Sequence, residues 1–148
     1  IEVAKLHSKE MNLNINYINC APENFNFKNK FDVILNMEVI EHVSNVEIFI
    51  QNCSKFTREN GIMFVATINR NLKSYLHTIL GAEYILRWLP IGTHDWNKFL
   101  TPQELEVIVK KNNFKIDETV GVKFNFLLKK WSKCSDVSVN YISTFLKV

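Results

Sequence analysis

The sequence predicts an α/β domain built on a doubly wound sheet, and three observations support this prediction. Two nearly continuous apolar stretches, residues 31–37 and 62–68, have the composition of strands buried on both faces of a sheet. An amphipathic helix is expected between them, at residues 45–57. Strand, helix and strand in this order, with short connections, predict a parallel crossover, which is the repeating unit of a doubly wound sheet.

The elements before and within this unit follow in chain order. Residues 1–11 have the composition of a helix, and because the chain opens directly inside it with Ile1, we expect further sequence upstream. Residues 15–20 alternate apolar and polar side chains and predict a strand of the same sheet. In the helix at 45–57 apolar side chains recur at intervals of three and four, and Asn60 and Gly61 are expected to end it.

The stretch from 71 to 90 is rich in Leu, Ile, Tyr and Trp and precedes a polar turn at 92–98. Its apolar side chains would lie on several sides of a helix at 72–88, with the basic residues Arg70, Lys73 and Arg87 at the edges. Two interpretations stay open. The helix is either part of the core, or an interfacial helix that docks on an anionic membrane and admits a lipid substrate.

The last part of the chain predicts one more helix and two more strands. Thr101 supplies an N-cap, Pro102 a first-turn proline and Glu104 a capping-box glutamate, so a helix should occupy residues 102–112. Residues 114–122 and 137–146 are strand candidates, and the polar, lysine-containing stretch between them predicts a hairpin.

Composition limits the classes of protein to which the chain can belong. With 148 residues and 47% hydrophobic side chains it can form one domain, and a net charge of +3 is too small to indicate a nucleic-acid partner. Its three cysteines form no CxxC pair, which favours a reducing compartment. The sequence lacks an apolar run long enough to span a membrane and a secretory signal, so we expect a cytoplasmic protein.

The densest polar cluster is Glu38, Glu41 and His42, directly after the strand that ends at Met37. Ligands of open α/β sheets bind at the carboxyl ends of strands, so this position favours a functional role for the three side chains. A helical turn would place all three side chains on one face, where they could bind a divalent cation or supply a general base. The alternative is that Glu41 and His42 only pair with neighbours and hold the loop.

Two further groups of polar residues are candidates. His94 could accept a proton, with Asp95 orienting its imidazole, or Asp95 could simply close an Asx-type turn. Asn69, Arg70 and Asn71 follow the strand at 62–68 and either contact a substrate or begin a helix. For Asn69 helix capping is the favoured interpretation.

Four segments of the sequence indicate a resemblance to one protein family. They are NMEVIEHV at 36–43, TINRN at 67–71, GAEYILRWLPIGTHDWNKFLTPQEL at 81–105 and DVSVNY at 136–141, and together they resemble the ubiquinone-biosynthesis O-methyltransferases. EVIEHV alone is typical of class I methyltransferases in general, whereas the segment at 81–105 is much more specific. The resemblance implies a Rossmann-like class I S-adenosylmethionine-dependent methyltransferase sheet.

The same resemblance implies a reaction: transfer of a methyl group from S-adenosylmethionine to a phenolic hydroxyl of a polyprenylated ubiquinone precursor, 3-demethylubiquinol or 2-polyprenyl-6-hydroxyphenol. Met37 would contact the cofactor, and Glu38, Glu41 and His42 would match the family's magnesium positions. The chemistry is consistent with these residues, because a cation bound to the phenol oxygen, or a catalytic base such as His42 or His94, would favour the phenolate. The implied partners are the surface of a bacterial inner membrane and a complex of ubiquinone-biosynthesis proteins.

Departures from the family predict an incomplete, N-terminally truncated domain over residues 1–148. The family's glycine-rich cofactor turn and first strands have no counterpart, because none of the four glycines lies in a cluster. Their absence would leave unpaired strand edges in the sheet. A second class of function is therefore a non-catalytic lipid-binding or scaffold fragment from a split gene. A third class, a nicotinamide-dependent oxidoreductase, has no support, because the chain lacks the dinucleotide-binding fingerprint of that class.

Overall fold

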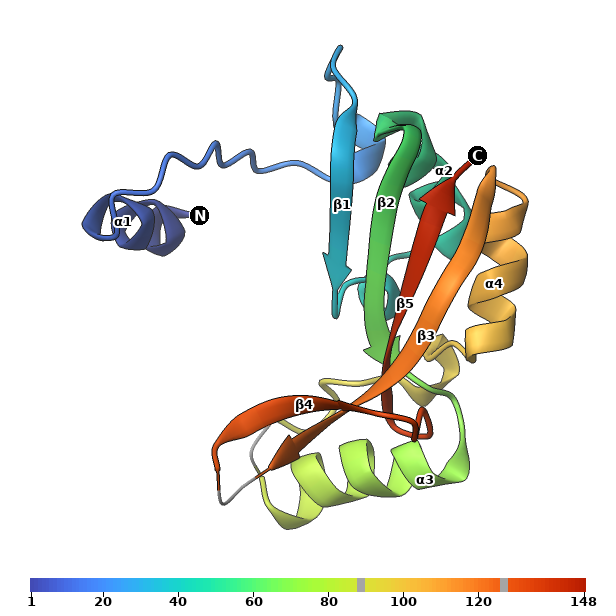
Figure 1. Cartoon of the computed structure of the whole chain (residues 1–148). Coiled ribbons are helices and arrows are strands. Elements are labelled where there is room, and N and C mark those ends of the chain that lie inside the picture. Colours follow the sequence, from blue (N-terminus) through green and yellow to red (C-terminus); the bar gives the residue numbers. More distant parts are fainter. Residues whose placement is uncertain (88–89, 126–127) are drawn as a thin grey trace.

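A computed structural model of the chain describes residues 1–87, 90–125 and 128–148 (Figure 1). The first half contains α1 (Glu2–Glu10), η1 (Pro22–Asn24), β1 (Phe31–Met37), η2 (Ile40–His42), α2 (Val46–Phe56) and β2 (Thr57–Ile68). The second half contains α3 (Leu72–Ser74), η3 (Tyr75–Ile85), η4 (Trp96–Lys98), α4 (Pro102–Lys110), β3 (Phe114–Asn125), β4 (Lys130–Cys134) and β5 (Asn140–Lys147).

One mixed sheet organises the molecule, with strand order β1-β2-β5-β3-β4. β1 and β2 are parallel and are joined through α2, which confirms the predicted parallel strand-helix-strand unit. β5 runs antiparallel between β2 and β3, and β4 pairs with β3 as a hairpin at the far edge. The predicted hairpin is thus confirmed, although its residues 126 and 127 lie outside the described residues.

Helix α4 begins where its capping residues predict. The backbone N–H of Glu104 donates to Thr101 Oγ1 (3.2 Å), and the backbone N–H of Thr101 donates to Glu104 Oε2 (2.9 Å). These two backbone N–H groups have no acceptor within the helix, and the capping residues supply one for each.

Helix α2 is shorter than predicted, because it ends at Phe56 and β2 begins with the next residue. Asn60 and Gly61 do not end the helix; they lie inside β2, where Asn60 has a φ of 62°. A Cβ on Gly61 would lie 2.8 Å from the carbonyl oxygen of Arg58, so this position needs glycine for close packing.

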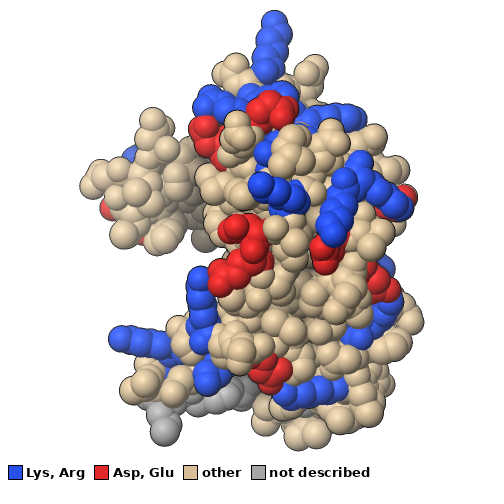
Figure 2. Space-filling model, turned by 45° about the vertical axis from the view of Figure 1, so that its right-hand side comes forward, with Lys and Arg blue, Asp and Glu red and all other residues tan. Residues whose placement is uncertain are grey.

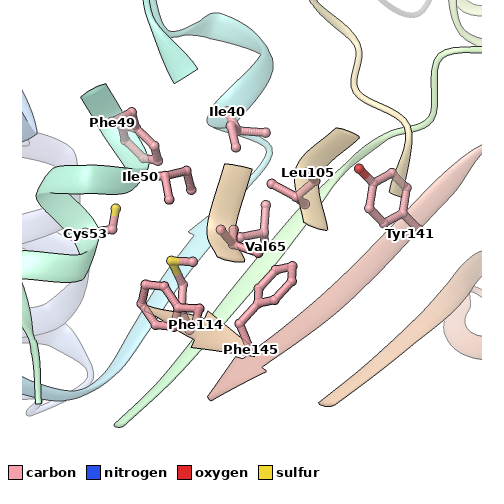
Figure 3. Packing of buried hydrophobic residues seen from close by; sticks show 11 residues of the cluster. Ile40, Phe49, Ile50, Cys53, Val65, Leu105, Phe114, Tyr141 and Phe145 are labelled. Carbon is pink, nitrogen blue, oxygen red and sulfur yellow. The ribbon is translucent and has the colours of Figure 1, made fainter. Parts of the chain in front are cut away.

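The hydrophobic core lies between one face of the sheet and the helices α2 and α4 (Figure 3). β5 shows how the core is built: its alternate residues Tyr141, Ser143, Phe145 and Lys147 are buried, and those between are half-buried. The fully buried side chains of the core come from η2, both helices and three strands: Ile40, Phe49, Ile50, Cys53, Met63, Val65, Leu105, Val109, Phe114, Tyr141 and Phe145.

The opposite face of the sheet is open at the β1 edge, so the prediction of strands buried on both faces is wrong for β1. Val33, Leu35 and Met37 are exposed, because α1 lies apart from the sheet (Figure 1). The prediction of a strand at 15–20 is also wrong. A strand needs a hydrogen-bonded neighbour, and no described residue pairs with this stretch.

The apolar stretch predicted at 72–88 forms α3 followed by the π-helical segment η3; residues 88 and 89 lie outside the described residues. Ser74, Ile79 and Glu83 are buried, whereas Leu72 and Leu76 are exposed. A helix buried all round is therefore excluded, and one apolar side faces solvent. In the described part of the chain, no helix combines the length and apolar character that crossing a bilayer requires.

Candidate functional site

The turn after β1 carries the first group of candidate residues. Glu38 directly follows the strand in the left-handed region, with a φ of 53°, and its backbone N–H donates to the carbonyl of Ala66 in β2 (3.0 Å). Non-glycine residues in this region carry strain and concentrate at functional sites. η2 then brings Glu41 and His42 to the same end of the parallel pair β1 and β2, as their position in the sequence predicts.

Glu41 is a buried carboxylate with one oxygen left unbonded. Its side chain is 2% exposed, and Oε2 accepts a hydrogen bond from Thr67 Oγ1 of β2 (2.7 Å). Oε1 has no hydrogen-bond partner, whereas the other buried side-chain oxygens and nitrogens of the described residues have one. His42 Nε2 lies 4.0 Å from it. An unbonded buried oxygen is costly and attracts a proton or a cation.

Glu38 lies near Glu41, although Glu38 as a whole residue is exposed and Glu41 is buried. Loss of water around its carboxyl group, followed by the charge of Glu41, raises the pKa of Glu38 to about 7. The negative charge of Glu41 thus disfavours ionisation of Glu38.

A stability measurement tests the raised pKa of Glu38. Because the pKa of Glu38 is higher in the folded chain than its ordinary value of 4.5, protonated Glu38 stabilises the fold below pH 4.5, and this contribution is lost as the pH rises to about 7. Glu38→Gln should remove that part of the pH dependence, by about 1 kcal/mol or less because solvent still screens the exposed part of the residue. Urea unfolding of both proteins between pH 4.5 and 7.5 measures it; parallel curves would contradict the assignment.

The predicted three-residue metal set is only partly assembled. Within residues 1–87, 90–125 and 128–148, no three His, Cys, Asp or Glu side chains are arranged so that they could hold a metal ion. Glu38 and Glu41 come together, whereas the imidazole of His42 is half exposed beside them. The predicted set of three metal ligands is therefore not assembled in the described part of the chain.

His94 is held by a residue that sequence reasoning missed. Its Nδ1 lies 2.9 Å from Glu83 Oε1 of η3, so Glu83 and not Asp95 orients this imidazole. Asp95 instead accepts a hydrogen bond from the backbone N–H of Asn97 (3.0 Å) and caps η4, as the Asx-turn alternative predicted. A glutamate within an apolar stretch was the signal that could have identified Glu83, because a buried acid needs partners.

The structure brings the two predicted histidines together. The rings of His42 and His94 are 6.3 Å apart between centroids, although 51 residues separate them in the chain. Met37, the predicted cofactor contact, is the last residue of β1 and is exposed. The predicted catalytic residues therefore line one end of the sheet.

The polar residues after β2 are structural. Asn71 is the N-cap of α3 and accepts from the backbone N–H of Ser74 (2.9 Å), so the capping role predicted for Asn69 belongs to Asn71. Asn69 donates to the carbonyl of Val137 (2.9 Å), and Arg70 pairs with Glu104. These contacts join the end of β2 to the loop before β5 and to α4.

A cavity of about 710 Å³ lies elsewhere, between η1, β1 and α2. Phenylalanine rings line much of it, with Phe25 set edge-on to Phe56 at 5.0 Å between centroids. None of the predicted catalytic or metal-binding residues lines it. The cavity borders the turn after β1 through Asn36 and Val39, but His42, His94 and the two glutamates do not line it.

Comparison with known proteins points to one family. Residues 5–119 match the family model described as a methyltransferase domain. The chain is 54% identical over 147 residues to a ubiquinone biosynthesis O-methyltransferase of Pelagibacter ubique, and this match covers 99% of the chain but 61% of that relative. The chain thus spans about three-fifths of the length of this relative.

Solved structures agree on the fold. An S-adenosylmethionine-dependent methyltransferase of Clostridium acetobutylicum superposes with a TM-score of 0.68 at 10% identity, covering 99% of this chain and 70% of that one. The magnesium protoporphyrin IX methyltransferase of Synechocystis, described with bound S-adenosylhomocysteine, gives 0.66 at 11% identity, covering 100% and 59%. The predicted Rossmann-like class I methyltransferase fold is confirmed.

Proposed function

The chain belongs to the methyltransferase domain family, and from this premise we propose that it provides the acceptor side of an S-adenosylmethionine-dependent O-methyltransferase of ubiquinone biosynthesis. The proposed acceptor is a phenolic hydroxyl of a polyprenylated ubiquinone precursor. The observation that carries this proposal is the pair His42 and His94, brought together with Glu41 at the carboxyl end of β1.

The chemistry needs a proton acceptor, because a neutral phenol is a poor nucleophile. We assign this role to His94, with His42 beside it as the second candidate. The phenol gives its proton to the imidazole, its oxygen bonds to the methyl carbon, and the carbon–sulfur bond of the sulfonium breaks, leaving neutral S-adenosylhomocysteine. Met37 remains the proposed cofactor contact, supported by its exposed position at the end of β1.

Magnesium belongs to the proposal through the two carboxylates. Glu38 and Glu41 would hold the ion, supported by the unbonded Oε1 of Glu41 and the raised pKa of Glu38. His42 would join them only if its half-exposed imidazole turned toward the ion. A bound divalent cation supplies a positive charge that favours the ionised phenol. Without an ion, Thr67 holds one oxygen of Glu41 in place.

The direct test compares this chain with a chimera in which residues 1–148 replace the matching part of the Pelagibacter ubique relative. The chimera should transfer a radiolabelled methyl group from S-adenosylmethionine to a short-chain demethylubiquinol. Glu41→Gln should weaken its magnesium dependence, with Glu47→Gln, at an exposed position of α2, as the control. A folded chimera that transfers no methyl group would contradict the proposal and favour the non-catalytic lipid-binding or scaffold alternative.

We further propose that the exposed side of α3 and η3 rests on a membrane. Leu72, Leu76 and Ile85 are 73%, 49% and 76% exposed, and the basic Lys73 and Arg87 flank them. An apolar surface with flanking bases suits an anionic bilayer, and a polyprenyl tail would reach the site from it. Figure 2 shows lysine and arginine mixed with acidic residues on the face it presents.

Replacing Leu72, Leu76 and Ile85 together with serine should lower binding of the chain to vesicles of anionic phospholipid about tenfold or more, because apolar area no longer inserts. Vesicle co-sedimentation measures the change. Exposed Val107 of α4, replaced with serine, is the control and should leave binding unchanged. Equal binding by the triple variant would exclude this surface. Ile79 is buried and should not be included, since its loss would disturb the fold.

A further inference from the structure

We infer that Glu83 is a positioning residue: it holds the His94 imidazole in the tautomer with a proton on Nδ1, which leaves Nε2 free to accept a proton from the acceptor. Only the second part of this inference, that Nε2 accepts a proton from the acceptor, rests on the proposed function. The tautomer follows from the contacts of Glu83 itself.

Glu83 is built into the structure as an acceptor. Its side chain is 1% exposed, and both oxygens are bonded. Oε2 accepts from the backbone N–H of Gly92 (2.7 Å), and Oε1 accepts from the backbone N–H of His94 (2.9 Å). The same Oε1 lies 2.9 Å from His94 Nδ1. These contacts satisfy a buried carboxylate within a largely apolar helix.

The charge of Glu83 decides which ring nitrogen carries the proton. Burial alone would raise the pKa of Glu83, but the hydrogen bonds from Gly92 and His94 outweigh it and lower the pKa below its usual value. An ionised carboxylate can only accept hydrogen bonds. The hydrogen between Oε1 and Nδ1 must therefore belong to His94, and a neutral His94 then carries a lone pair on Nε2.

The surroundings of His94 keep this arrangement in place. The ring of Phe99 packs edge-on to the imidazole, with 5.9 Å between centroids. Gly92 has a φ of 86°, which lets the turn bring its N–H to Glu83. The side chain of His94 is 11% exposed, and among the described residues its Nε2 has no hydrogen-bond partner. The free nitrogen lies on the opposite side of the ring from Glu83.

A purely structural role for Glu83 predicts a different result. If Glu83 only closed the turn at 90–94, glutamine would serve nearly as well through its carbonyl oxygen, and the tautomer of His94 would not matter. Glutamine, however, also has an amide N–H₂, which can donate to an unprotonated Nδ1 and allow the other tautomer. Glu83→Gln therefore separates positioning from turn closure, and Asp95→Asn in the neighbouring turn is the matched control.

The first arm of the test uses the 148-residue chain, labelled with ¹⁵N, and reads the imidazole nitrogens by long-range ¹H–¹⁵N NMR at a pH where His94 is neutral. We expect a protonated Nδ1 and an unprotonated Nε2 for His94, unchanged by Asp95→Asn and shifted toward the Nε2-protonated form by Glu83→Gln. A wild-type His94 protonated on Nε2 would overturn the inference. The wild-type measurement needs no variant, so it decides the tautomer of His94 even if Glu83→Gln fails to fold.

The second arm measures kinetics in the chimera with the Pelagibacter ubique relative. Glu83→Gln should lower kcat at least about tenfold with little change in KM, because the base is misoriented while acceptor binding is kept. Glu83→Asp keeps the charge and should recover part of the loss. A Glu83→Gln chimera with wild-type kcat would overturn the positioning role. If the wild-type chimera shows no methyl transfer at all, the proposed function fails, and the NMR arm still decides the tautomer.

Discussion

Replacing His94 with alanine in the chimera is expected to lower kcat by about 10²–10⁴-fold with little change in KM, because a general base contributes this much when its proton transfer occurs in the transition state. His94 is the stronger of the two candidate bases, since Glu83 and Phe99 hold its imidazole on two sides. His42 is half exposed and is held by no hydrogen bond of comparable length among the described residues.

The matched control is His77→Ala, which removes an exposed imidazole from the same helical segment that carries Glu83. This variant should keep the wild-type kcat. Steady-state assays at several pH values compare the three proteins, and thermal melting shows whether each is folded. A His94→Ala chimera with at least half the wild-type kcat would exclude His94 as the base and leave His42 as the remaining candidate.

Replacing Phe145 with alanine should destabilise the chain by about 3–5 kcal/mol, because it removes a large side chain from a packed core and leaves a cavity. Phe145 is 0% exposed and lies in β5, at the centre of the sheet between β2 and β3 (Figure 3). A loss of this size is a large part of the whole stability of a typical domain, which is about 5–15 kcal/mol.

Urea unfolding followed by circular dichroism measures this loss. Phe145→Leu keeps most of the volume and should cost clearly less than Phe145→Ala, so it gives a measurable value even if the alanine variant does not fold. Val107→Ala on the exposed side of α4 is the control and should change the free energy of unfolding by about 0.5 kcal/mol or less. Equal midpoints for Phe145→Ala and wild type would contradict the described core.

Local patterns predicted much of the fold. The capping residues Thr101 and Glu104 located the start of α4 correctly, because capping bonds join residues only three positions apart. The apolar runs located β1 and the greater part of β2, and their order with α2 predicted the parallel pair. The position of Glu38 and Glu41 after a strand also predicted a site at the carboxyl end of β1.

Other features depend on neighbours that a pattern does not contain. Residues 15–20 alternate like a strand, yet no described strand lies beside them, and a strand without a hydrogen-bonded partner does not form. The end of α2 was misplaced because Asn60 and Gly61 fit a helix end and equally the irregular start of β2. Asp95 lies next to His94 in the chain, but the imidazole bonds to Glu83, eleven residues away.

The sequence by itself thus determined the family resemblance, the strand-helix-strand unit and the residue types of the site, since these follow from spacing, capping and composition. Only the tertiary structure decided that β1 lies at an edge, that Glu41 keeps an unbonded buried oxygen, and that Glu83 holds His94. The physical reason is that burial and hydrogen-bond partners are properties of groups far apart in the chain, and they become definite only when packing brings those groups into contact.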